Sequence, residues 1–146
     1  MAAMERSEIE AYLRDGYVVP EYRLPTAKVA ELAGALEVVI ENNPGIRPEQ
    51  LAGVHLSQGP YQPVKGHQAF LDMALDRELA DLVAGVLGEN LVLWGCQIFC
   101  KPGLDGMEVP MHQDGQYWPI RPMATCTVWI AIDDSDRENG CLTVLP

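Results

Sequence analysis

The sequence predicts an α+β domain in which helices come first and an antiparallel sheet packs against them. Two observations lead to this prediction. Apolar residues recur at helical spacing up to about residue 89, and they occur in runs of strand length with strand periodicity from residue 90 onward. A run of helices followed by a run of strands is typical of α+β folds. We therefore expect a single domain over residues 1–146, helical in 1–89 and built from strands in 90–146.

The first helix is predicted to begin at Ser7, because Ser7 and Glu10 have the spacing of a capping box. Gly16 is expected to end this helix, since glycine readily adopts the left-handed conformation that follows a helix. Residues 17–19, Tyr-Val-Val, then predict a short strand that Pro20 ends.

Two further helices are predicted by spacing and capping. One covers about residues 26–42, and the other is capped by Asp76, runs through Leu87 and stops at Gly88. The proline- and glycine-rich residues 46–66 predict a long connection between them. The side chains expected to face the core are Val29, Leu32, Ala33, Leu36, Ile40, Leu79, Leu82, Val83 and Val86.

Three strands are predicted after residue 90, over about 91–101, 125–132 and 141–145. Successive side chains of a strand point to opposite faces. One face of the first strand would carry Val92, Trp94, Cys96, Ile98 and Cys100, and the other would carry Leu93, Gln97, Phe99 and Lys101.

Composition limits the function classes. The 146 residues carry a formal net charge of −11, which argues against nucleic acid as a partner and mildly against a polyanionic substrate. No apolar run is long enough to cross a membrane, and the first residues do not have the pattern of a signal peptide. We expect a cytoplasmic protein without a membrane or nucleic-acid partner. The four cysteines, which form no Cys-x-x-Cys pair, are expected to be reduced thiols.

The triplet His112-Gln113-Asp114 predicts part of a metal site. On an extended chain, residues two apart project to the same side, so the imidazole and the carboxylate would lie together. They would supply two of the three ligands of the 2-His-1-carboxylate arrangement that binds iron(II) in oxygenases. The triplet alone is unspecific, since roughly one chain in five of this composition would contain it by chance. A zinc hydrolase that takes its third ligand from His55 or His67 is a weaker alternative.

The surroundings of the triplet are far more specific, because they resemble the phytanoyl-CoA dioxygenase family. The resemblance is strong over about residues 86–146 and looser before them. It rests on KPGLDGMEVPMHQDGQYWPIRP (101–122), TVWIAIDDS (127–135) and ENGCLTVLP (138–146), and it extends to DGYVV (15–19) and LGENLVLW (87–94). The family fold implied by this resemblance is a double-stranded β-helix, a cupin-like jelly roll, with helices supporting one sheet.

The resemblance also implies the chemistry. It implies iron(II), 2-oxoglutarate and oxygen, with His112 and Asp114 as iron ligands and with Trp129 and Gln97 at the 2-oxoglutarate site. The reaction would hydroxylate an unactivated C–H bond of a small organic substrate while 2-oxoglutarate is converted to succinate. Related halogenases lack the carboxylate ligand, so Asp114 favours hydroxylation.

The family pattern continues beyond the last residue of this sequence. No histidine follows His112, so the second iron-binding histidine and the arginine that pairs with 2-oxoglutarate are absent. Only three short strands fit after Asp114, which leaves the roll incomplete. We expect a truncated portion of a longer enzyme, inactive alone, whose partner is the missing C-terminal half of the fold. The alternative is a non-catalytic binding or assembly module.

Overall fold

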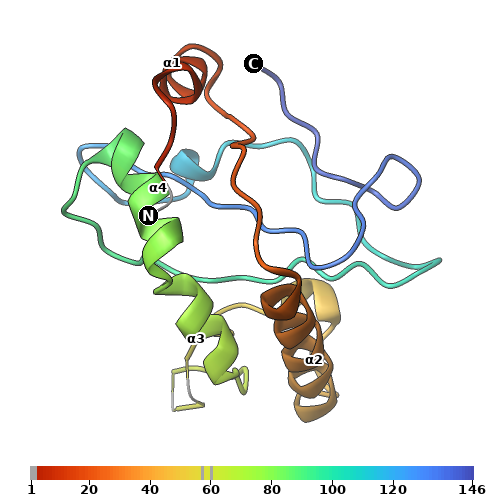
Figure 1. Cartoon of the computed structure of the whole chain (residues 1–146). Coiled ribbons are helices and arrows are strands. Elements are labelled where there is room, and N and C mark those ends of the chain that lie inside the picture. The colour runs from red at the N-terminus through yellow and green to blue at the C-terminus, as the bar shows by residue number, and fades with distance from the viewer. Residues whose placement is uncertain (1–2, 57, 60) are drawn as a thin grey trace.

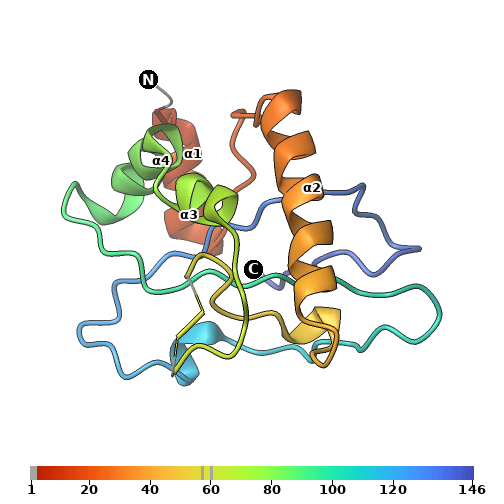
Figure 2. The same ribbon diagram turned by 90° about the horizontal axis from the view of Figure 1, so that it is seen from below.

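Helices form the regular structure of the protein in the computed structural model, which describes residues 3–56, 58–59 and 61–146. Figure 1 shows a helical part and a long irregular part, and Figure 2 shows α2 standing apart from α1 and α4. Helix α2 packs against α3, and α1 packs against α4. The elements are α1 (Arg6–Asp15), α2 (Thr26–Asn42), η1 (Pro48–Gln50), α3 (Gln68–Ala74), α4 (Arg77–Leu87) and η2 (Asp114–Gln116), where η marks a 3₁₀ helix.

The sequence predicted α2 and α4 correctly. Helix α2 has the predicted bounds, and Asp76 caps α4 by accepting hydrogen bonds from the backbone N–H groups of Glu78 and Leu79. None of the described helices is both long and apolar enough to cross a membrane.

The start of α1 was predicted two residues too late. The N-cap is Glu5, and the Glu8 carboxylate accepts a hydrogen bond from the Glu5 N–H at 2.7 Å. The capping box is therefore built from two glutamates, and the Ser7–Glu10 pair lies inside the helix. Gly16 ends α1 as predicted, with a φ of 80°.

Helix α3 was not assigned from the sequence. His67 caps it, because the Nδ1 atom of its ring accepts a hydrogen bond from the Ala69 N–H at 3.2 Å. The chain before this cap is held by Asn43, whose side chain bonds both the N–H and the carbonyl of Lys65. Gly66 is required there, since a Cβ atom would lie 2.2 Å from the Val54 carbonyl oxygen.

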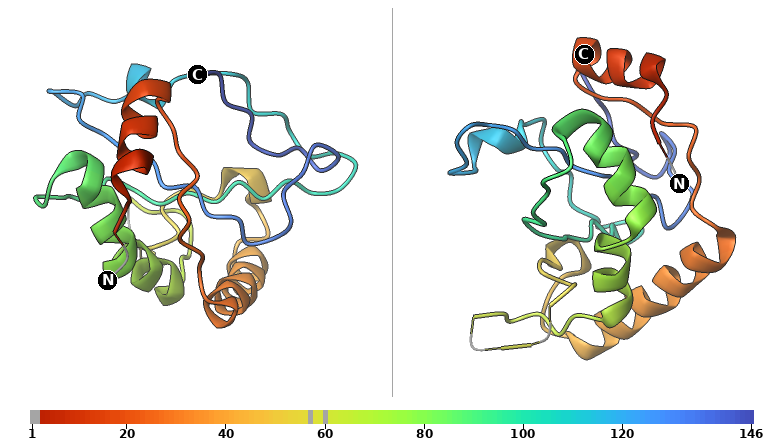
Figure 3. Two further views of the ribbon diagram at one scale, coloured as in Figure 1. Left: turned by 45° about the horizontal axis from the view of Figure 1, so that its top comes forward. Right: turned by 60° about the vertical axis from the view of Figure 1, so that its left-hand side comes forward.

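The expected double-stranded β-helix is wrong for the part of the chain that the structure describes. Residues 17–19, 91–101, 125–132 and 141–145 form no strands, and pairing is limited to the isolated bridges Ala52–Gln97 and Gly59–Gln62. Figure 3 shows residues 90–146 from two further sides as long loops interrupted by η2. A strand needs a neighbour along its length. Here residues 91–101 exchange only two backbone hydrogen bonds with residues 51–53, Gly53 N–H to Cys96 and Ile98 N–H to Leu51.

The alternation expected along residues 91–101 is present only over 96–101, because Val92 and Trp94, expected on the inward face, are 92% and 61% exposed. Ile98 is buried and Cys96 and Cys100 are half-buried, whereas Gln97 and Phe99 are exposed. Ile98 thereby joins the core, which otherwise comes from the helical part. The core consists of Leu32, Ala35, Leu36, Val39, Leu51, Val54, Val64, Ala69, Phe70, Met73, Leu79, Leu82 and Ile98.

Candidate metal centre

His112 and Asp114 lie side by side at the start of η2. The Nε2 atom of His112 is 3.2 Å from the Oδ1 atom of Asp114, and the two side chains are 36% and 43% exposed. The sequence predicted this closeness from an extended backbone. In the structure Asp114 instead opens a 3₁₀ turn, in which the Tyr117 N–H donates to the Asp114 carbonyl at 3.0 Å.

A backbone carbonyl sets the protonation of the His112 ring. Its Nδ1 atom lies 2.7 Å from the Pro110 carbonyl oxygen. A carbonyl can only accept, so Nδ1 carries the hydrogen and the lone pair of the neutral ring is on Nε2, facing Asp114. This hydrogen bond, followed by the hydrogen bond and charge of Asp114, raises the pKa of His112.

Thr127 holds the other oxygen of Asp114. Its hydroxyl donates to Asp114 Oδ2 at 2.9 Å and leaves Oδ1 turned to the imidazole. Sequence reasoning missed Thr127, although the residue precedes Trp129 by two positions in the segment that carries the family resemblance. A metal-binding carboxylate is commonly held in place by such a hydrogen bond.

The donor pair fits one metal ion. Two ligand atoms about 2.1 Å from an ion and at right angles to each other are about 3 Å apart, close to the 3.2 Å between Nε2 and Oδ1. The Nδ1–H bond to a carbonyl is the usual support of a metal-binding histidine. The same distance also suits an ion pair between a protonated His112 and Asp114. In the described ranges, no third His, Cys, Asp or Glu joins them to complete a metal site.

The other two predicted site residues are not joined to this pair. Gln97 is exposed and lies in the isolated bridge with Ala52, and Trp129 is 47% exposed. Within the part of the chain described by the structure, neither side chain is hydrogen-bonded to His112 or Asp114. Tyr117 flanks the pair, and its ring meets the His112 ring edge to face with centroids 6.2 Å apart.

The remaining histidines have other surroundings. His67 caps α3, and half-buried His55 has its pKa lowered by burial. Neither joins His112 and Asp114 in a group of three ligands among the described residues, so the geometry does not favour the zinc alternative. All four cysteines are free and half-buried, which agrees with the expected reduced thiols.

The family model described as Phytanoyl-CoA dioxygenase (PhyH) matches residues 12–146. The chain belongs to this family. The predicted resemblance is thus confirmed, and the match covers all of the residues discussed above as a candidate site. Membership places the protein in a family named for dioxygenases.

Relatives with this family name occur in distant eukaryotes. The human peroxisomal phytanoyl-CoA dioxygenase is 28% identical over 153 residues, covering 92% of this chain and 44% of the relative. A phytanoyl-CoA dioxygenase domain-containing protein 1 homolog of Dictyostelium discoideum is 34% identical over 77 residues, covering 53% of this chain and 27% of the relative. The chain thus spans less than half the length of these curated relatives. No solved structure matches it.

Proposed function

We propose that this chain supplies His112 and Asp114 as two ligands of the iron(II) site of a 2-oxoglutarate-dependent dioxygenase. The observation that carries the proposal is the 3.2 Å distance between His112 Nε2 and Asp114 Oδ1. The Pro110 carbonyl holds the His112 ring, and the Thr127 hydroxyl holds the Asp114 carboxylate. The pair lies inside the stretch matched by the family model. Both side chains are more than a third exposed, so further ligands have access to the metal position.

When bound, iron(II) with 2-oxoglutarate and oxygen supplies the oxidation that hydroxylates a C–H bond and yields succinate and carbon dioxide. The protein's own residues prepare the site. Pro110 keeps the hydrogen on Nδ1 of His112, so that Nε2 is free to bind metal. Thr127 fixes the rotation of the Asp114 carboxylate. We assign Gln97 and Trp129 to the 2-oxoglutarate side of the site on family resemblance alone.

The third ligand and the arginine for 2-oxoglutarate come, in this proposal, from outside the 146 residues. The partner of this chain is then the C-terminal half of the family domain, and the substrate is a small organic molecule. The net charge of −11 disfavours a substrate with many negative charges, including a coenzyme A ester. We further propose that the protein works in the cytoplasm.

The alternative is a non-catalytic module of the same family that binds or assembles with other proteins. It is favoured by the exposed apolar side chains of residues 90–146, which would suit a protein interface. The two functions differ in their dependence on His112, because a binding module would not need it.

The test is succinate formation from 2-oxoglutarate by the full-length natural protein, loaded with iron(II) without oxygen and then exposed to oxygen. We expect His112→Ala and Asp114→Ala each to abolish succinate formation. His67→Asn is the matched control, because asparagine retains the helix cap and the variant also loses one imidazole. Unchanged succinate formation in His112→Ala would refute the iron site.

The 146-residue chain by itself should bind iron(II) weakly and turn over negligibly, because it offers two ligands to the metal among its described residues. Tight binding of one iron per chain, together with succinate production, would contradict this assignment of ligands.

A further inference from the structure

An ion pair with one buried partner, Glu49, lies between η1 and the loop before His112. Glu49 in η1 is the one buried charged residue of the described chain, at 7% exposed. Its oxygens accept hydrogen bonds from Arg47, at 2.8 Å from Nη2 and 3.3 Å from Nε. A buried carboxylate is costly unless it is paired and hydrogen-bonded in this way.

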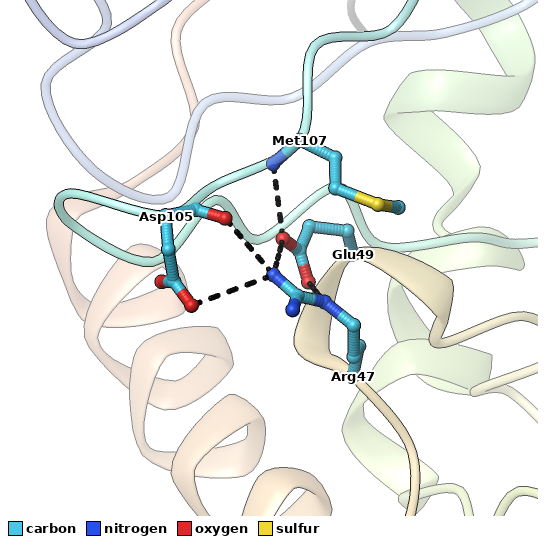
Figure 4. Close-up of polar contacts among 4 residues, drawn as sticks. All are labelled: Arg47, Glu49, Asp105 and Met107. Carbon is cyan, nitrogen blue, oxygen red and sulfur yellow. Dashed lines mark hydrogen bonds and ion pairs between the residues drawn. The ribbon is translucent and has the colours of Figure 1, made fainter.

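Arg47 and Glu49 also form hydrogen bonds with residues 105–107, which are distant in sequence. The Met107 N–H donates to Glu49 Oε1 at 3.1 Å, and Arg47 Nη2 donates to the Asp105 carbonyl at 3.0 Å. The Asp105 carboxylate is 3.9 Å from Arg47 Nη2. Figure 4 shows the four residues converging, with the guanidinium between the Glu49 and Asp105 carboxylates. We call Arg47 and Glu49 together the latch.

The latch is the main polar attachment of this loop. Residues 103–111 are exposed, and in the described chain the hydrogen bonds that tie 103–109 to distant residues are those to Arg47 and Glu49. The loop leads directly to Pro110, whose carbonyl accepts the His112 Nδ1–H. The position of that carbonyl therefore depends on where residues 105–107 are held.

We propose that Arg47 and Glu49 are positioning residues for the candidate metal centre, holding the 102–110 loop so that Pro110 orients His112. This inference rests on the proposed function, since it gives the latch a role only if His112 binds metal. The latch stays charged in mildly acidic solution, because the hydrogen bonds from Arg47 and the backbone lower the pKa of Glu49 to about 2.

Stability alone does not require these two charges, because an ion pair that contains a buried charge can often be replaced by apolar side chains of similar size at little cost. Here Glu49 is the buried partner, 4% exposed, and Arg47 is 44% exposed. Apolar side chains, however, cannot accept from the Met107 N–H or donate to the Asp105 carbonyl. The double variant Arg47→Met/Glu49→Met therefore separates the positioning role from a merely structural one.

The probe is Mn²⁺ titrated into the full-length natural protein, with paramagnetic broadening of the Tyr117 amide resonance as the readout beside the site. We expect the double variant to need about tenfold more Mn²⁺ for half-maximal broadening, the lower end of the losses seen when support of a ligand is removed. Glu49→Met alone should weaken binding in the same direction, because methionine cannot accept from the Met107 N–H, and it decides the question if the double variant fails to fold.

Asp76→Asn is the matched control. Asp76 forms a similarly shielded ion pair with Lys28 between α2 and α4, it does not touch the loop, and asparagine keeps the cap of α4. This variant should bind Mn²⁺ like the wild type. Wild-type affinity in both latch variants would overturn the positioning role. Persistent Tyr117 broadening in His112→Ala would instead show that the metal does not use His112, and the proposed function itself would fall.

Discussion

The helical region, residues 3–89, and the following region, residues 90–146, contain the same kinds of apolar side chain but bury them differently. The helical region buries Leu51, Val39 and Val54 almost completely. In the second region Ile98 is the one residue in the buried core of the described chain, and Val92, Trp94 and Leu145 are 92%, 61% and 73% exposed. Helices satisfy their own backbone, whereas extended segments need partners distant in sequence.

The largest expected difference between the regions is in amide hydrogen exchange. Interior amides of α2 and α4 should open with free energies of about 5 kcal/mol or more, near the value for global unfolding. Amides of residues 125–132 should have opening free energies close to zero, because these residues make no backbone–backbone hydrogen bonds in the described chain. The Ile98 amide, which donates to Leu51, is an internal control and should be protected. Equal protection of 125–132 and α2 would contradict the comparison.

Truncating one leucine in each region should give the next largest contrast. Leu51 is 1% exposed, so Leu51→Ala should lower the free energy of unfolding by about 2–5 kcal/mol. Leu142 is 59% exposed, and Leu142→Ala should change it by less than about 0.5 kcal/mol. Urea denaturation followed by circular dichroism measures both. Similar losses would mean that the second region contributes to the core as much as the first.

A single methyl group in α2 should have a smaller and opposite effect. Gly34 lies inside α2 with open space around its position, so Gly34→Ala should stabilise the protein by about 0.5–1 kcal/mol. Gly16 has a φ of 80°, and Gly16→Ala should destabilise by about 1 kcal/mol. Thermal unfolding measures both, and the same sign for the two variants would count against these helix bounds.

Tyr22→Phe should have a small effect, about 0.5 kcal/mol near neutral pH. The Tyr22 hydroxyl donates to Glu78 at 3.0 Å. Burial, and then Glu78, raise the pKa of Tyr22 from 10.0 to about 12. This stabilisation is fully present below pH 10 and is lost as pH rises through about 12. The advantage of the wild type over the variant in unfolding free energy should fall in that window. An advantage of the wild type that grows there would contradict the assignment.

The sequence was sufficient to predict those helices and caps that depend on residues close together along the chain. The bounds of α2 and the Asp76 cap of α4 follow from local spacing and hydrogen bonding. Helix α3 was missed because seven residues give little periodicity and histidine is an unusual cap. The β-helix prediction was wrong because alternation along 91–101 indicates which side chains would share a face of a strand, not whether another segment pairs with it.

The candidate site divides in the same way. His112 and Asp114 are two residues apart, and their closeness could be predicted. Thr127 and the latch residue Glu49 are separated from their partners by 13 and 58 positions. No local sequence pattern indicates contacts at such separations, so the residues that hold the site in place could be identified only from the structure.

The inward-facing side of residues 96–100 also has a consequence for redox chemistry. Burial raises the pKa of both Cys96 and Cys100, and the carboxylates of Asp133 and Glu49 raise that of Cys100 further. At neutral pH both sulfurs are therefore uncharged thiols, whereas the thiolate is the form that oxidants attack and that soft metals capture. A chain proposed to bring iron and oxygen together keeps these two sulfurs in their least reactive form.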